Sequence, residues 1–187
     1  MSDRLQTALL HVFRRLPPFL RRRIVRLITP SFTVGAICLI ERPDGKVLLV
    51  QQVYRTAWGV PGGLSKKGED IAACAKREVL EETGIPIDLV GEPAVVVDAG
   101  PQRVDVVYRA RPAAGVDVSN VTPQSPEIAD LRWFALDELP ELQHEAVSAL
   151  AALTRASAQA RLDLPLDRLR PQTTPRGLSR HGLDESA

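Results

Sequence analysis

Three glutamates in the middle of the chain have a spacing that could bind a metal ion. Glu78, Glu81 and Glu82 share one face of the helix predicted over residues 69–83, because successive helical residues turn by about 100°. Like charges at this spacing repel one another. The three glutamates also border the apolar stripe of the helix, so they face partly inward. This stripe consists of Ile71, Ala75 and Val79. Hard carboxylate oxygens in such a cluster suit Mg²⁺ or Mn²⁺ rather than Zn²⁺. The alternative is a solvated acidic face in which Arg77 and Glu81 form an i,i+4 ion pair.

A glycine-rich loop before this helix adds backbone groups to the candidate site. Gly62 and Gly63 allow a positive φ or a close approach to a ligand, and a carbonyl freed there could point at the same cation. Gly63 and Gly68 frame four residues, as in a phosphate-binding P-loop. However, Glu69 and Asp70 stand where a P-loop has Lys and Ser or Thr. These acids would repel a phosphate, which excludes a P-loop nucleotide hydrolase and requires that the phosphate arrive with metal ions.

The spacing of these residues resembles the Nudix box, G-x5-E-x7-R-E-U-x-E-E-x-G-U, in which U is aliphatic. All nine specified positions match, and the box spans 23 of the 187 residues: Gly63, Glu69, Arg77, Glu78, Val79, Glu81, Glu82, Gly84 and Ile85. The motif that starts at Trp58 is similar to the segment that precedes the box in the family, and the motif that starts at Trp133 is similar to a segment that follows it. The resemblance therefore covers about residues 32–155. It implies the α/β class, with a Nudix α/β/α sandwich in which a mixed β-sheet lies between helices.

The resemblance also implies an activity and a set of site residues. Members of the family hydrolyse nucleoside diphosphates that are linked to a second moiety, with a divalent cation, Mg²⁺ or Mn²⁺, as cofactor. By resemblance, the metal ligands are these: Glu78, Glu81, Glu82 and the carbonyl of Gly62. Glu69 and Arg77 are implied to be supports that hold the loop and orient the carboxylates.

A general base is needed to take the proton from a metal-bound water, and more than one carboxylate could serve. The candidates are Glu81, Glu82 and Glu127, and the sequence does not choose among them. Glu127 lies in the loop predicted over residues 112–128, where some members of the family place a further catalytic or metal-binding acid. The alternative is an exposed loop acid that follows Pro126.

The substrate is less narrowly indicated. Pro101 lies 16 residues after the end of the box at Ile85, an offset that resembles ADP-sugar pyrophosphatases, although a single proline among 15 is a weak match. A compact (d)NTP pocket is the alternative. Tyr54 and Arg55 could stack on a base or bind a phosphate. We therefore expect a small nucleotide that contains a diphosphate, and no nucleic acid, as the partner.

Short strands and two helices are predicted to position this site. Gly84 is expected to end the helix over residues 69–83, and a second helix is expected over 137–156 on the opposite side of the sheet. The first two strands are predicted to pair as a hairpin, because residues 42–45 between them have turn chemistry. The predicted strands are residues 32–40, 46–53, 86–91, 94–98, 103–110 and 129–135.

The first thirty residues differ from the rest in charge. Residues 1–30 hold seven Arg and one acid, Asp3, which gives +6, so the total net charge of +1 leaves −5 for the remainder. Apolar residues recur at helical spacing on both sides of Pro17-Pro18, which predicts an N-terminal arm of two short amphipathic helices. We expect this arm to pack on its own domain or on a second protomer of a homodimer. Contact with a membrane surface or an anionic partner is the alternative.

Composition supports one folded domain, assigned to residues 31–156, followed by a flexible tail over 157–187. The 44% hydrophobic and 25% charged fractions are typical of a globular protein. Cys38 and Cys74 lie in apolar surroundings, which excludes a disulfide scaffold and favours a cytoplasmic location. The polar, Arg-bearing segment after Met1 is not typical of a secretory signal. Two rival functions remain: a non-catalytic nucleotide-sensing Nudix module and a membrane-surface protein that uses the arm.

Overall fold

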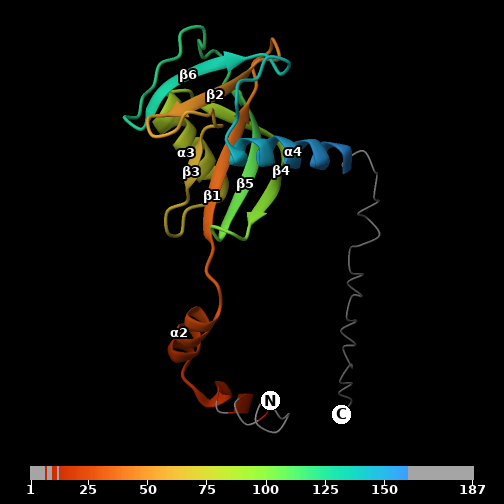
Figure 1. Cartoon of the computed structure of the whole chain (residues 1–187). Helices are drawn as coiled ribbons and strands as arrows, with labels where there is room; N and C mark the ends of the chain where they lie inside the picture. The colour runs from red at the N-terminus through yellow and green to blue at the C-terminus, as the bar shows by residue number, and fades with distance from the viewer. Residues whose placement is uncertain (1–6, 8–9, 12, 160–187) are drawn as a thin grey trace, which may run out of the picture.

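The computed structural model describes residues 7, 10, 11 and 13–159 (Figure 1). Most of the predicted tail, residues 160–187, lies outside the described residues. Residues 157–159, which were assigned to the tail, instead continue the last helix, α4, which spans His144–Gln159. In the described part of the chain, no helix is long and apolar enough to cross a membrane.

A four-stranded mixed sheet forms the centre of the body, in the order β3-β1-β5-β4. Its members are β1 (Thr33–Ile40), β3 (Gly62–Leu64), β4 (Ile87–Asp98) and β5 (Arg103–Pro112). Strands β1 and β5 are parallel, whereas β3 and β4 pair antiparallel with their neighbours. The predicted mixed sheet is therefore confirmed.

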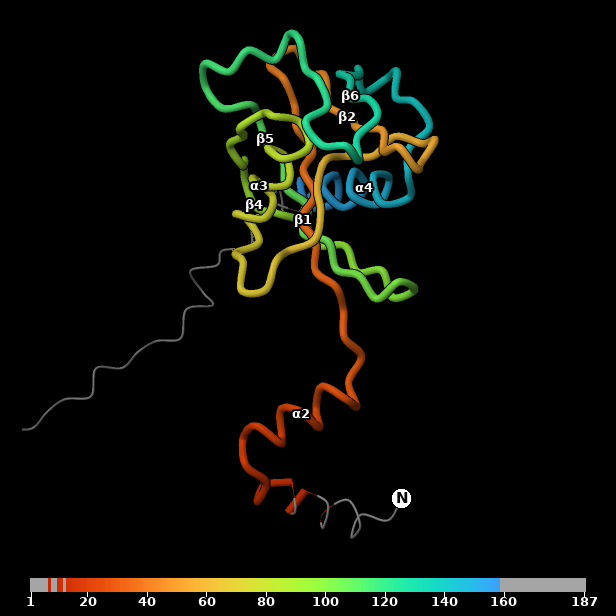
Figure 2. The backbone as a smooth tube through the Cα atoms, turned by 90° about the vertical axis from the view of Figure 1, so that its left-hand side faces the viewer, coloured from red at the N-terminus to blue at the C-terminus, as the bar shows by residue number. Residues whose placement is uncertain are grey.

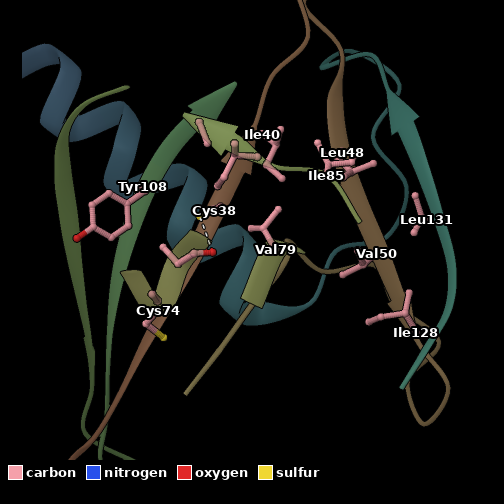
Figure 3. Packing of buried hydrophobic residues seen from close by; sticks show 14 residues of the cluster. Cys38, Ile40, Leu48, Val50, Cys74, Val79, Ile85, Tyr108, Ile128 and Leu131 are labelled. Atoms are coloured by element: carbon pink, nitrogen blue, oxygen red, sulfur yellow. Dashed lines mark hydrogen bonds between the residues drawn. The ribbon is translucent and has the colours of Figure 1, made fainter. Parts of the chain in front are cut away.

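Two helices cover the opposite faces of this sheet, and the alternation of side chains along β1 shows why. Ala36, Cys38 and Ile40 belong to the apolar cluster of α3 (Ile71–Thr83), part of which Figure 3 shows. The residues between them, Ile37 and Leu39, pack with α4. Since successive strand residues point to opposite faces, β1 is apolar on both sides and its last six residues are buried.

The predicted hairpin between the first two strands is wrong in its pairing. Strand β2 (Val47–Gln52) pairs with β6 (Ile128–Phe134) in a separate two-stranded sheet, and only an isolated bridge joins Glu41 to Val47. The turn exists, with a hydrogen bond from the Gly45 amide to the Arg42 carbonyl (2.9 Å). Both edges of β1 are occupied by β3 and β5, so β2 has to find another partner.

Helix α3 has the boundaries that its cap residues dictate. The Asp70 carboxylate accepts hydrogen bonds from the amides of Ala72 and Ala73, both 3.0 Å. Gly84 ends the helix in the left-handed conformation, with φ of 71°, as predicted. The helix therefore starts at Ile71 rather than at residue 69, which leaves Glu69 outside it.

Two other boundaries also differ from the predictions. The strands predicted near 86–91 and 94–98 are one strand, β4, with an irregular register between Val90 and Ala94. Helix α4 starts at His144 rather than at Asp137, because Pro140 interrupts the helical pattern.

The N-terminal arm lies apart from the body. Its helix α2 (Pro18–Ile28) begins at the second proline of the predicted break at Pro17-Pro18, and no residue of it is buried. Figures 1 and 2 show the arm projecting from the start of β1 in two perpendicular views. The expected packing of the arm on its own domain is therefore wrong for the described residues. Packing on a second protomer stays a prediction.

Candidate active site

Several of the predicted site residues line one cavity of about 430 Å³ between the end of α3, strand β3 and the start of α4. Its lining includes Gly62, Gly63, Glu78, Glu82 and Glu127 from the predicted set. Glu81, Arg77 and Glu69 lie outside the lining. Residues from three separate parts of the sequence are thus brought to one place.

Glu82 is the most deeply placed of the predicted acids, with 8% of its surface exposed. Its Oε2 accepts a hydrogen bond from the Gly62 amide (3.0 Å). Burial raises the pKa of Glu82 to about 8, and the negative charges of Glu78, Glu127 and Glu81 act in the same direction, whereas the Gly62 hydrogen bond lowers it. A buried carboxylate beside other carboxylates is the position at which a cation would be most stabilising.

The two glycines are needed because no larger residue would fit beside β1 and α3. Gly62 has a φ of 152°, and a Cβ there would lie 2.3 Å from the Ala36 carbonyl oxygen. A Cβ on Gly63 would lie 2.4 Å from Oε2 of Glu78. Gly62 lies opposite Ile37 in the antiparallel pairing of β3 with β1, and the neighbouring Cys38 amide donates a hydrogen bond to the Pro61 carbonyl. Gly62 and Ile37 are therefore a pair without hydrogen bonds to each other, so the amide and the carbonyl of Gly62 both point away from β1. Its amide serves Glu82, and its carbonyl as a metal ligand stays a prediction.

Arg77 connects the loop before α3 to the helix. Its Nε and one terminal nitrogen donate to the two carboxylate oxygens of Glu69 at 2.6 and 2.8 Å, and it also bonds to the Leu64 carbonyl at 3.3 Å. The hydrogen bond from Arg77, aided by the Lys66 amide, lowers the pKa of Glu69 to about 2. These bonds also hold the pKa of Arg77 above its usual range. This geometry suits the supporting role predicted for the pair.

Arg77 also neutralises part of the acidic face of α3. It donates to Glu78 and, at 3.1 Å, to Glu81, so the i,i+4 ion pair foreseen as the alternative is present. Glu81 is further paired with Lys66 (3.7 Å), and its side chain is 54% exposed. The three glutamates are therefore not equivalent, since Glu82 is buried, Glu78 lies at the cavity wall and Glu81 lies outside the cavity lining.

The donor set fits a hard divalent cation, although the carboxylates are not gathered around one point. Among the described residues, no three His, Cys, Asp or Glu side chains are close enough together to hold a metal ion as they stand. The cavity nevertheless offers oxygen atoms from Glu78, Glu82 and Glu127 and no histidine or cysteine. Oxygen donors of this kind fit Mg²⁺ or Mn²⁺.

Glu127 lies at the cavity although it is far from the box in sequence. Its backbone carbonyl accepts a hydrogen bond from the Val53 amide (2.9 Å), which ties the loop before β6 to the end of β2. Its side chain is exposed and lines the cavity. The two descriptions of Glu127 as a site acid and as an exposed loop acid are therefore compatible, and its catalytic role stays a prediction.

The side of the cavity away from α3 carries residues that the sequence analysis only partly identified. Tyr54 and Arg55, predicted to contact a base or a phosphate, both line it, and Arg55 pairs with Glu145 (3.3 Å). Arg103 was missed. It forms two bonds, of 2.8 and 2.9 Å, to Asp105, which is buried on β5. A lone acid within an apolar strand was the signal that could have found this pair.

Two other lining residues were also missed, and one expected feature is not in the lining. Gln143 and Glu145, at the start of α4, became part of the cavity through the shifted helix boundary. Pro101 lies in the exposed turn between β4 and β5 and does not line the cavity. The resemblance to ADP-sugar pyrophosphatases at this position therefore has no support from a contact with the site.

A family model for the NUDIX domain matches residues 31–155. A MutT-like protein of Streptomyces ambofaciens is 29% identical over 134 residues, which cover 71% of this chain and 84% of that protein. An NAD-capped RNA hydrolase NudC of Stutzerimonas stutzeri is 34% identical over 119 residues, but the match covers 60% of this chain and only 40% of that relative.

Solved structures show the same architecture. The MutT NUDIX hydrolase of Burkholderia pseudomallei is 30% identical, with a TM-score of 0.55 over 66% of this chain and 99% of that one. A UDP-X diphosphatase is 22% identical, with a TM-score of 0.56 over 85% of this chain and 81% of that one, a likeness of fold.

Proposed function

This chain belongs to the NUDIX family of hydrolases, and from that premise we propose that it cleaves the diphosphate bond of a small nucleotide derivative with the help of Mg²⁺ or Mn²⁺. The observation that carries the proposal is the meeting of Glu78, Glu82 and Glu127 at one cavity, with the Glu82 carboxylate buried. Such a group of carboxylates is unfavourable without a cation. A bound cation would also allow a negatively charged diphosphate to approach these carboxylates, which would otherwise repel it.

The residues that would hold the ion are Glu78 and Glu82, with Glu81 and the carbonyl of Gly62 as further candidates. When bound, the ion would neutralise the diphosphate and lower the pKa of a water molecule so that it attacks phosphorus more readily. Arg77 and Glu69 keep α3 and its preceding loop in place, and so fix the direction of the Glu78 side chain.

Of the three candidate bases, Glu81 is the least suitable. It lies outside the cavity lining, and both Arg77 and Lys66 pair with it. Glu82 and Glu127 line the cavity, and neither forms an ion pair among the described residues. We therefore narrow the assignment of the proton acceptor to these two residues.

The opposite wall supports recognition of the rest of the substrate. Tyr54 offers an aromatic face, and Arg55 and Arg103 bring positive charge to the lining. Relatives named for NAD-capped RNA and UDP-X act on nucleotides in which a diphosphate carries a second group. The substrate class that we propose is accordingly a nucleoside diphosphate derivative or a (d)NTP, without a choice between them.

A panel of (d)NTPs, ADP-ribose, NADH, UDP-sugars and dinucleoside polyphosphates, assayed with Mg²⁺ for release of phosphate or pyrophosphate, tests this function. We expect turnover of at least one class, and Glu82→Gln should abolish it. Binding of a nucleotide without turnover of any would instead support the rival function, a nucleotide-sensing module. All box acids are present in this chain, which favours hydrolysis.

A further inference from the structure

Helix α2 has an apolar face of which Leu20 and Ile24 are partly exposed and Leu27 and Ile28 are largely exposed. Leu20, Ile24, Leu27 and Ile28 follow the spacing i, i+4, i+7, i+8, which places them on one face of the helix. Leu27 and Ile28 are 79% and 74% exposed. The helix projects away from the body in both views (Figures 1 and 2).

The remainder of α2 is strongly basic. Arg22 and Arg26 lie opposite the apolar face, Arg21 and Arg23 lie at its two borders, and the helix contains no acid. None of these four arginines forms an ion pair with a described residue. A partner that covers both sides of α2 therefore has to offer negative charge and an apolar environment together.

We propose that α2 docks the protein on an anionic lipid membrane. The helix lies in the plane of the membrane surface, its apolar face toward the acyl chains. The arginine side chains extend along the surface and place their guanidinium groups among the lipid phosphates.

The surface of the body beside the arm agrees with this orientation. A hollow next to the start of β1 is lined by Phe32 and Val34 together with Lys66 and Lys67. Lys66 is paired with Glu81, and Glu69 also lines the hollow, so Lys67 is the cation here that has no carboxylate partner among the described residues. Because Phe32 and Val34 lie where the arm meets β1, Lys67 lies beside the point where the arm joins the body and adds to the attraction toward an anionic surface.

Other partners satisfy only half of the helix. A nucleic acid would bind the arginines and leave Leu27 and Ile28 in water. A second copy of α2 would cover the apolar face but would bring two arginine-rich helices together without an acid from either. An anionic membrane accommodates both faces at once.

Co-sedimentation of the full chain with lipid vesicles tests the proposal. We expect binding to vesicles that contain phosphatidylglycerol, little binding to pure phosphatidylcholine, and weakening by added salt. The double variants Leu27→Gln/Ile28→Gln and Arg22→Gln/Arg26→Gln should each bind at least about tenfold more weakly. Because none of these residues is buried, both variants should keep the wild-type melting temperature and turnover of a soluble substrate.

Matched controls use exposed residues of the body. Val147→Gln on α4 and the double variant Arg109→Gln/Arg111→Gln on β5 remove the same kinds of group from surfaces away from the arm. These controls should bind vesicles like the wild type. Equal losses in the controls would show that membrane binding is unspecific and would overturn the proposal.

Three other results would also overturn it. One is the absence of vesicle binding by the wild type. Another is tight binding of a single-stranded RNA oligonucleotide that needs Arg22 and Arg26 but not Leu27, which would make α2 a nucleic-acid surface. The third is a dimer in light scattering that Leu27→Gln/Ile28→Gln dissociates, which would make α2 an interface between two copies.

Discussion

Arg77 on α3 and the arginines of α2 differ in what surrounds them. Arg77 makes bonds to Glu69, Glu78, Glu81 and the Leu64 carbonyl, and its side chain is mostly buried. The four arginines of α2 have no carboxylate partner among the described residues. The first arrangement organises an interior site, whereas the second leaves charge available to an outside partner.

This difference separates two uses of charge in one chain. In the body, acids outnumber bases, and three of the acids, Glu78, Glu82 and Glu127, line one cavity. In the arm, the excess is positive and faces outward. The same residue type therefore contributes to stability in one region and, in our proposal, to association in the other.

The largest expected effect is on turnover. Glu82→Gln should lower kcat by a hundredfold or more, about 2.7 kcal/mol of transition-state stabilisation, because the buried oxygen that would bind the cation loses its charge. Steady-state kinetics measures this loss, with exposed Glu92→Gln on β4 as the matched control. If the variant keeps normal kinetics, the acid cluster is not the catalytic centre.

The next effect concerns stability and compares the two regions directly. Arg77→Ala should lower the free energy of unfolding by about 2 kcal/mol, because it leaves several carboxylates without their partner. Arg22→Ala on α2 should change it by less than about 0.5 kcal/mol, as expected of an exposed site. Urea denaturation of both variants measures the contrast, and similar losses would contradict our distinction between the two regions.

A pH dependence of about the same size is expected for the metal-free protein. Glu82 has a pKa of about 8 in the folded state, against about 4.5 for a glutamate exposed to water. Between these values the folded state holds a proton that the unfolded state has released, so the stability present below pH 4.5 is lost as the pH rises toward 8. At about 1.4 kcal/mol per pKa unit, this difference allows a loss of up to about 5 kcal/mol, and we expect at least about 2 kcal/mol of it in EDTA.

Unfolding curves across this pH range measure the loss, and Glu82→Gln should flatten the dependence. Glu69 acts in the opposite direction at acid pH, since its folded pKa is about 2, so its stabilisation is present above pH 4.5 and is lost as the pH falls toward 2. Stability that increases between pH 4.5 and 8 in the wild type would contradict the assigned burial of Glu82.

A smaller effect is expected for Glu127. Glu127→Gln should lower kcat by about tenfold, or 1.4 kcal/mol, with a smaller rise in KM and no change in stability, because the side chain is exposed. Michaelis–Menten kinetics separates the two parameters. Wild-type values for both would return Glu127 to the class of exposed loop acids.

The smallest effect concerns recognition of the substrate. Tyr54→Ala should raise KM about threefold, or about 0.6 kcal/mol, with little change in kcat, because the exposed ring lines the cavity away from the acids. Titration of a non-hydrolysable nucleotide analogue provides an independent measure. A loss of kcat alone would place Tyr54 with the reacting groups instead.

How much of the fold and of the site could be predicted from the sequence depends on how far apart the interacting residues lie along the chain. The helix that carries Glu78 and Glu82, its Gly84 end and the i,i+4 pair of Arg77 with Glu81 follow from local spacing and cap chemistry. The support that Arg77 and Glu69 give to the loop was implied by the resemblance to the family. The pairing of β2 with β6 could not be foreseen in the same way. It joins Val47 to Phe134 and is decided by which strands occupy the edges of β1.

The missed half of the cavity has the same cause. The parallel register of β1 and β5 places Gly35 beside Asp105. A Cβ on Gly35 would lie 2.5 Å from the Asp105 carboxylate, so the missing side chain gives Asp105 and its partner Arg103 the room they occupy at the cavity wall. Gln143 and Glu145 joined the lining because α4 begins after Pro140 rather than before it. The arm was assigned correctly as helical, but apolar spacing does not specify which surface covers it.

Hydrolysis by a metal-stripped sample tests the central claim most directly. The wild-type protein is dialysed against EDTA, then assayed on its best substrate with and without added Mg²⁺ or Mn²⁺. If the acids of the cavity work through a bound divalent cation, hydrolysis is absent in EDTA and returns on addition of either ion in the wild type but not in Glu82→Gln. Full activity of the metal-stripped wild type would contradict the account.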